Sequence, residues 1–138
     1  MVQSFEMTIG SDIEKIPAVS ARFEGAMGAY GFSPEDILDT QLAVEEAITN
    51  IIVHGYKKTG GKIHLSCSIT RNRIAIRITD TAPPFDPLSI PEPDLEGDMD
   101  ERKIGGLGVY LLRQMMDDIS YRYENGNNIL TLEKRRSS

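Results

Sequence analysis

The chain has 138 residues, enough for one domain that buries its own hydrophobic core without disulfides or a structural metal. Its formal net charge of -6 argues against duplex nucleic acid as a direct partner, because binding to a phosphate backbone needs a basic surface. No apolar run approaches the roughly 20 residues of a membrane span, no signal-peptide pattern is present, and a single cysteine excludes an internal disulfide. We therefore expect one cytoplasmic domain over residues 1–138, with no direct contact to nucleic acid or membrane.

The first part of the chain predicts a strand followed by two helices. Apolar and polar residues alternate over residues 4–9, as in a half-buried strand. A helix is predicted over about residues 12–30, and Gly31 is placed to end it. A second helix follows, with Ser33 as its N-cap and Pro34 in its first turn.

The middle of the chain predicts a β-hairpin and a long loop. Residues 63–70 and 74–79 both alternate with a period of two, which indicates two antiparallel strands with one covered face. The second strand ends on Asp80. Residues 81–103 contain five prolines and a cluster of acidic residues without periodicity, so we expect a long loop of the kind that often acts as a lid.

The last part of the chain predicts a helix and a second hairpin. Helical spacing of apolar residues begins just after the glycine-rich segment 105–108. Two strands over residues 119–123 and 129–132 then form a hairpin around residues 124–128. One-sided strands and three amphipathic helices predict an α+β fold, a two-layer sandwich in which the helices pack on one face of a mostly antiparallel sheet.

Three polar side chains interrupt the apolar pattern of the second helix. Glu46, Asn50 and His54 are spaced by four residues and therefore share one flank, beside the core-facing side. Four residues along a helix span about 6 Å, so neighbouring members of this set can reach one ligand. A group buried there without a partner costs roughly 1–3 kcal/mol, which favours a ligand or an ion. The alternative is structural, with Glu46 solvated, Asn50 hydrogen-bonded locally and His54 placed as a cation near the helix end.

The turn that begins at Asp80 and the glycine-rich segment 105–108 add to this pattern. The glycine segment precedes a helix N-terminus, where free N–H groups and the helix dipole favour an anion such as a triphosphate. Each feature also has a structural explanation, since aspartates are common in turns and glycines adopt backbone conformations that other residues disfavour. The spacing fits neither a P-loop nor a dinucleotide-binding fingerprint.

Taken together, these segments resemble the GHKL or Bergerat-type ATPases, the superfamily of gyrase, MutL and the histidine kinases. The narrower resemblance is to the RsbW-type anti-sigma factor serine/threonine kinases. Residues 46–56 resemble their N-box, residues 80–87 their G1 box and residues 105–116 their G2 box. The resemblance covers nearly the whole chain in the order of the family, and it implies the Bergerat fold with ATP and Mg²⁺ as cofactors.

The resemblance implies distinct roles for three residues. Asn50 would coordinate Mg²⁺ through its side-chain oxygen, with ATP phosphates and water as the remaining ligands. Glu46, one turn earlier, would be the catalytic general base that takes the proton from an attacking hydroxyl. Asp80 would accept a hydrogen bond from the amino group of adenine.

The other nucleotide-binding residues that the resemblance implies lie in or beside the same boxes: His54, Ala82, Phe85, Gly105, Gly106, Leu107 and Gly108. Gly106 and Gly108 would supply backbone near the phosphates, and the loop over about residues 88–104 would form the ATP lid. In the alternative interpretation, His54 caps the end of the helix.

The sequence departs from the family pattern at two places. Ala82 stands where the G1 box usually has glycine, which disfavours a positive φ and affects the expected affinity for ATP. In the final hairpin Gly126 is followed by Asn127, where many relatives have threonines, so the last adenine contact is left open.

By resemblance, the expected function is that of an anti-sigma regulatory factor with serine/threonine kinase activity. Its partners would be ATP, a sigma factor or equivalent client, and an antagonist that it phosphorylates, an anti-anti-sigma protein of the STAS type. Relatives often form homodimers, although no exposed apolar stripe in the sequence demonstrates one.

Three other functions are less consistent with the sequence. An ATP-dependent binding module that switches partners without phosphoryl transfer is disfavoured by the retention of Glu46. The catalytic domain of a histidine kinase ranks lower, because the sequence shows no phosphoacceptor helix and no sensor region. A zinc site from His54, His64 and Cys67 ranks lowest, since the spacing resembles no common ligand set.

Overall fold

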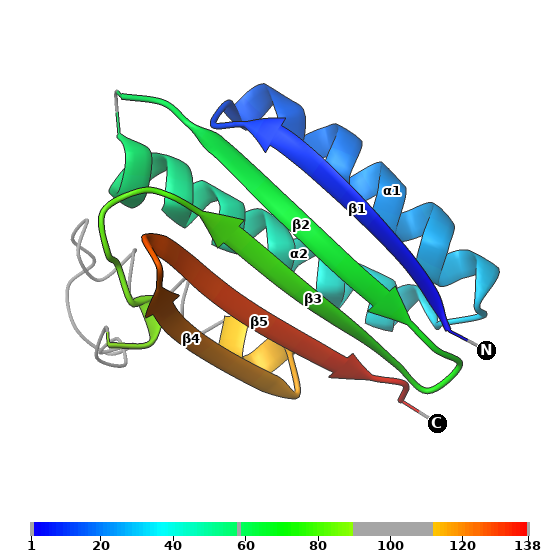
Figure 1. Ribbon diagram of the computed structural model, residues 1–138. Helices are drawn as coiled ribbons and strands as arrows, with labels where there is room; N and C mark the ends of the chain where they lie inside the picture. The colour runs from blue at the N-terminus through cyan, green and yellow to red at the C-terminus, as the bar shows by residue number, and fades with distance from the viewer. Residues whose placement is uncertain (1, 58, 90–111, 138) are drawn as a thin grey trace, which may run out of the picture.

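The computed structural model describes residues 2–57, 59–89 and 112–137, which form one antiparallel sheet with helices on one of its faces (Figure 1). The helices and strands are β1 (Gln3–Gly10), α1 (Ile16–Ala29), α2 (Pro34–Asn50), the π-helix η2 (Ile51–Tyr56), β2 (Lys62–Ile69), β3 (Arg73–Asp80), β4 (Asp118–Glu124) and β5 (Asn127–Arg135), with short 3₁₀ turns η1 (Ile13–Lys15) and η3 (Pro87–Ser89). Residues 112–115 are also helical, while the predicted start of that helix lies outside the described residues. The predicted α+β sandwich is confirmed. No helix in the described ranges has both the length and the apolar character to cross a membrane.

The sheet has the order β1-β2-β3-β5-β4, and every neighbouring pair is antiparallel. Its register places Ile63 of β2 opposite Asp80 of β3, and Asp80 opposite Asn128 of β5. The inward row of β3 is therefore apolar along most of its length and ends in a carboxylate. This end of β3 lies away from the two chain termini (Figure 1).

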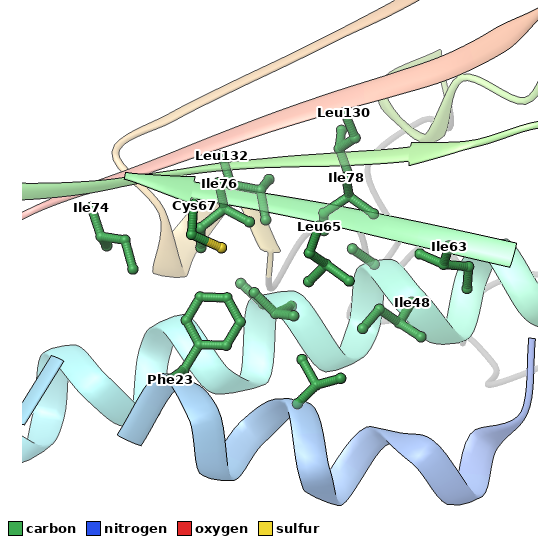
Figure 2. Close-up of a cluster of buried hydrophobic side chains, with 14 of the residues drawn as sticks. Phe23, Ile48, Ile63, Leu65, Cys67, Ile74, Ile76, Ile78, Leu130 and Leu132 are labelled. Carbon is green, nitrogen blue, oxygen red and sulfur yellow. The ribbon is translucent and has the colours of Figure 1, made fainter. Parts of the chain in front are cut away.

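The hydrophobic core lies between the sheet and the two long helices. Phe23 of α1 and Ile48 of α2 are fully buried and point toward the strands (Figure 2). The strand side chains that meet them in Figure 2 are Ile63, Leu65, Cys67, Ile74, Ile76, Ile78, Leu130 and Leu132. Because full burial of one such side chain contributes roughly 1.5–3 kcal/mol, this core fixes the position of α2 on the sheet.

Local sequence signals account for the start of each long helix. Ser33 Oγ accepts a hydrogen bond from Asp36 N at 3.1 Å, which confirms the predicted N-cap of α2. The predicted first helix is divided, because Asp12 caps the 3₁₀ turn η1 and α1 begins only at Ile16. Pro17 lies in the first turn of α1, where a missing N–H leaves no intrahelical hydrogen bond unmade.

The end of α2 differs from the regular helix that the sequence predicts. The chain widens over Ile51–Tyr56 into the π-helix η2, in which Lys57 N donates to Ile52 O at 2.9 Å. Single π turns of this kind are frequent at functional sites. The four-residue spacing therefore places Asn50 one regular turn after Glu46, whereas His54 lies in the wider turn.

The final hairpin turns more tightly than predicted. Its loop consists of Asn125 and Gly126 alone, with φ of 53° and 79°, as in a type I′ turn. An asparagine-glycine pair is favoured there because both positions need a positive φ. Asn127 and Asn128 consequently belong to β5 rather than to the loop, and Asn128 pairs with Tyr123 of β4.

The C-terminal residues are tied to the start of α2. Asp36 is 1% exposed, and its carboxylate accepts hydrogen bonds from Ser137 Oγ at 2.6 Å and from Ser137 N at 3.1 Å. The neighbouring Arg136 donates to the carbonyl of Tyr30 at 3.1 Å. Burial acts to raise the pKa of Asp36, but the hydrogen bonds from Ser137 and the charge of Lys134 hold the pKa below its ordinary value of 3.8.

Replacing Ser137 tests this contact. Ser137→Ala is expected to lower the free energy of unfolding by about 1 kcal/mol near neutral pH, because a hydrogen bond to a buried carboxylate is lost. Since folding lowers the pKa of Asp36, the stabilisation is present above pH 3.8 and is lost as the pH falls further. Urea denaturation at several pH values should therefore show a difference from wild type that shrinks only in acid. Ser120→Ala, on an exposed position of β4, is the control, and an equal loss in both variants would contradict the role of Ser137.

Candidate functional site

A cavity lies between the C-terminal part of α2 and the end of the sheet where β3 stops. Asn50 lines it from α2, Asp80 from β3 and Asn128 from β5, while apolar side chains such as Phe85 and Leu130 form much of the remaining wall. Polar groups from three separate elements therefore converge on one hollow.

Asn50 contributes the least satisfied polar group of the cavity. The residue is 7% exposed, yet its Nδ2 has no hydrogen-bond partner. Within the described part of the chain, it is the one fully buried side-chain nitrogen or oxygen without a partner. Because such an atom costs about 1–3 kcal/mol, the unpaired amide edge favours a ligand over the structural alternative of a local hydrogen bond.

Asp80 lines the same cavity from the end of β3 and is 5% exposed. Its Oδ1 accepts hydrogen bonds from Asn128 Nδ2 at 2.9 Å and from Ala82 N at 3.0 Å. No described residue donates to its Oδ2. Burial raises the pKa of Asp80, while the two hydrogen bonds oppose that rise. The ionised carboxylate can thus accept one further hydrogen bond, from an amino group of a ligand.

Glu46 and His54 flank the cavity without lining it. Glu46 is half-buried one turn before Asn50, and burial raises the pKa of Glu46, while the charge of His54 lowers it in part. The exposed ring of His54 stacks on Phe85, with ring centroids 5.7 Å apart. A carboxylate whose pKa is raised beside a cavity is suited to accept a proton.

A family model decides to which group of proteins this arrangement belongs. The model of the histidine kinase-like ATPase domain matches residues 9–134. The chain belongs to this family. The resemblance to the GHKL superfamily is thereby confirmed.

Two curated relatives narrow the comparison. The serine-protein kinases RsbW of Bacillus thuringiensis (strain Al Hakam) and Bacillus cereus (strain 03BB102) are each 30% identical over 132 residues, which cover 93% of this chain and 82% of the relative. Among solved structures, the crystal structure of the RsbU and RsbW domains of Rv1364c from Mycobacterium tuberculosis matches with a TM-score of 0.68 and 17% identity. That match covers 99% of this chain and 33% of the solved chain, and it supports the fold.

Part of the predicted site of this histidine kinase-like ATPase domain can be placed. Asn50, Asp80 and Phe85 line one cavity, as the sequence predicts, with Glu46 and His54 at its flank. Gly105, Gly106, Leu107, Gly108 and nearly all of the expected lid over residues 88–104 lie outside the described residues. The roles assigned to the individual residues stay predictions.

Ala82, one of the predicted nucleotide-binding residues, does not line the cavity. It is 3% exposed, and its φ is not positive, so the backbone at this position does not require glycine. The position that requires a small residue is instead Gly55, which faces Ala82. A Cβ added to Gly55 of η2 would lie 3.1 Å from the Cβ of Ala82. Gly55 therefore makes room for the methyl group of Ala82.

Sequence reasoning missed three residues that organise the cavity. Asn128 binds Asp80, and Tyr121 of β4 donates to Asn128. Tyr56, at the end of η2, donates to Lys62 O at 2.6 Å and accepts from Thr81 N at 2.9 Å, which joins the helix to β2 and to the residue after Asp80. The asparagine-glycine turn was the one sequence signal that could have placed Asn128 in β5.

The residues of the zinc alternative do not converge. His64 lies on the outer face of β2, where its ring nitrogens lie 2.8 Å from Thr8 Oγ1 and 3.2 Å from Glu6 Oε1. Cys67 points to the opposite face, where burial raises the pKa of its thiol to about 12. Such a thiol stays protonated and is a poor metal ligand.

The contact between Gly55 and Ala82 predicts coupled substitutions. Gly55→Ala is expected to lower the free energy of unfolding by about 1–2 kcal/mol, because two methyl groups would crowd. In an Ala82→Gly background the same change should be neutral or stabilising, since alanine is normally preferred over glycine in a helix. A double-mutant cycle by urea denaturation measures the coupling. Additive effects of the two substitutions would contradict the contact.

Proposed function

We propose that this chain is an ATP-dependent protein serine/threonine kinase that acts as an anti-sigma regulatory factor. It binds a sigma factor or an equivalent client, and it phosphorylates an antagonist of the STAS type. The observation that carries the proposal is the unpartnered amide of Asn50, buried in a cavity shared with Asp80 and one turn from the raised-pKa carboxyl of Glu46. The relatives named serine-protein kinase RsbW support the assignment of kinase chemistry.

The residues of the cavity fit ATP with Mg²⁺. Mg²⁺ accepts amide oxygens as ligands. A rotation of the Asn50 side-chain amide by 180° places Oδ1 where the unpaired Nδ2 now lies, so this side chain can present an oxygen to the ion. Asp80 Oδ2 offers an acceptor for the exocyclic amine of adenine, and Phe85 supplies apolar surface for a purine ring. When bound, ATP supplies the phosphoryl group and Mg²⁺ neutralises part of the phosphate charge.

Glu46 provides the proton acceptor of the proposed reaction. A general base is most effective when its pKa lies near the working pH, and burial moves the pKa of Glu46 in that direction. Its carboxylate holds the proton that the serine or threonine hydroxyl of the antagonist gives up. The positive charge of His54 opposes the effect of burial and so keeps a larger fraction of Glu46 ionised.

Replacing Glu46 separates the kinase from a binding module without transfer. Glu46→Gln is expected to lower phosphoryl transfer by about 10²- to 10⁴-fold and to leave Mg-ATP affinity within a few-fold of wild type. The assay uses radiolabelled ATP with small candidate antagonist proteins of the STAS type, and the label is expected on serine or threonine. Wild-type transfer should fall as the pH drops through the raised pKa of Glu46.

Glu45→Gln is the matched control, because Glu45 Oε1 accepts a hydrogen bond from Ser20 of α1 at 2.6 Å and so faces away from the cavity. Its transfer rate should remain close to wild type. Unchanged transfer by Glu46→Gln would eliminate the assignment of the base. ATP binding by wild type without any transfer to these proteins would select the binding module instead.

Asn50 is tested through the metal dependence of binding. Asn50→Ala is expected to weaken Mg-ATP binding about tenfold or more, because a ligand of the ion is lost. Isothermal titration calorimetry with and without Mg²⁺ measures the difference. Asn72→Ala, the same change at an exposed position between β2 and β3, is the control. Equal Mg²⁺ dependence in wild type and Asn50→Ala would refute the role of Asn50.

A further inference from the structure

We propose that Asn128 is a positioning residue for base selection. It holds the carboxylate of Asp80 so that one oxygen is presented to the ligand as an acceptor, which favours a purine with an exocyclic amine over one with a carbonyl at the same position. This inference rests on the proposed function, because it assumes that the cavity binds the base of a nucleotide.

The donor side of the Asn128 amide is fully used by the protein. Nδ2 donates to Asp80 Oδ1 at 2.9 Å, and it lies 3.0 Å from Ala82 O and 3.3 Å from Pro83 O. An amide nitrogen has two hydrogens, so three acceptors leave none of them free. One side chain of β5 therefore holds both Asp80 and the chain that follows it.

The hydrogen bonds that Asn128 Oδ1 accepts determine the orientation of the side-chain amide. Asn128 Oδ1 accepts hydrogen bonds from Phe85 N at 3.1 Å and from Tyr121 OH. Burial raises the pKa of Tyr121, so its hydroxyl remains protonated and donates. A reversed amide would turn its NH₂ group toward these two donors, which excludes that orientation. With both lone pairs and both hydrogens engaged, Asn128 has no capacity left to contact a ligand and acts through Asp80.

Asp80 is therefore held as a hydrogen-bond acceptor toward the ligand. Its Oδ1 is engaged by Asn128 and by Ala82 N, and no described residue donates to Oδ2. Burial raises the pKa of Asp80, and the hydrogen bond from Asn128 opposes this rise, which favours the ionised form. An ionised carboxylate accepts from an amino group and repels a carbonyl oxygen. Loss of Asn128 would allow a protonated carboxyl, which can donate to a carbonyl.

Asn128→Asp is the most informative variant, because it keeps the shape of the side chain and replaces the donor by an acceptor. The new carboxyl faces Asp80 and must share a proton with it, since like charges at this distance disfavour double ionisation. The other titratable groups around the pair are Tyr121 and Tyr123 of β4 and Asp86. Wild-type affinity for ATP should fall as the pH drops, because a protonated Asp80 no longer accepts.

In Asn128→Asp the loss of ATP affinity is expected at a higher pH than in wild type. Affinity for ATP should fall about tenfold or more as the pH drops from about 8.5 to about 6, because the carboxyl pair then takes up a shared proton and Asp80 no longer presents a free acceptor. The ratio of ATP to ITP affinity should also fall about tenfold, since ITP carries a carbonyl in place of the amine. Calorimetry with both nucleotides and Mg²⁺ measures these quantities on the full chain.

Two further variants complete the test. Asn127→Asp makes the same change at the neighbouring position, whose side chain points away from Asp80, and it should keep the wild-type pH profile and base preference. Tyr121→Phe removes one donor to Asn128 and should lower the ATP to ITP ratio several-fold while the fold is kept. If Asn128→Asp does not fold, Tyr121→Phe decides the question.

A measurement without nucleotide separates this inference from the proposed function. Carbon-13 NMR of the Asp80 carboxyl in the ligand-free protein should show a higher pKa in Asn128→Ala and in Tyr121→Phe than in wild type. Failure of wild type to bind ATP would overturn the proposed function, whereas an unchanged titration of Asp80 in these variants would overturn the positioning role. A wild-type pH profile and base preference in a folded Asn128→Asp would overturn it as well.

Discussion

The packing of α2 along the inner face of the sheet determines where the predicted site residues lie. Ile48 is fully buried among strand side chains, so the helix cannot rotate without exposing its apolar face. This orientation holds Asn50 on the flank that meets the end of β3. Because the inward row of β3 ends in Asp80, helix and strand enclose a polar hollow at the edge of an apolar core. The predicted site residues thus lie on a helix and a strand that the core holds in place, and the hollow is a direct result of how those elements pack.

Three buried or half-buried acidic residues differ in the direction in which the fold shifts their pKa values. Asp36 has its carboxylate paired with Ser137, and its pKa is lowered, as in a group whose charge is satisfied by the protein. The pKa values of Glu46 and Asp80 are raised instead, because burial exceeds the stabilisation that their partners supply. Asp80 lines the cavity that also holds the unpartnered amide of Asn50, and Glu46 lies one helical turn before Asn50 at the flank of this cavity. Unsatisfied or destabilised charge concentrated at one place is the pattern expected of a binding or catalytic site.

The sequence was sufficient for features that depend on local patterns. Alternation predicted the strands, Ser33 predicted the start of α2, and the position of Asp80 at a strand end followed from the hairpin. It was insufficient where the outcome depends on pairing between distant segments. Asn128 meets Asp80 only because β5 pairs with β3 in one register, across 48 positions of sequence. The π-helix η2 was likewise not predicted, because the apolar periodicity of residues 51–56 does not distinguish it from a regular helix.

The proposed function requires the hollow between Asn50 and Asp80 to receive a magnesium-bound adenine nucleotide. A crystal structure of the full chain grown with Mg²⁺ and a non-hydrolysable ATP analogue would show whether it does. We expect the adenine amino group against Asp80 Oδ2 and the metal ion on the amide oxygen of Asn50. A nucleotide bound elsewhere on the chain, or an ion held without Asn50, would contradict it.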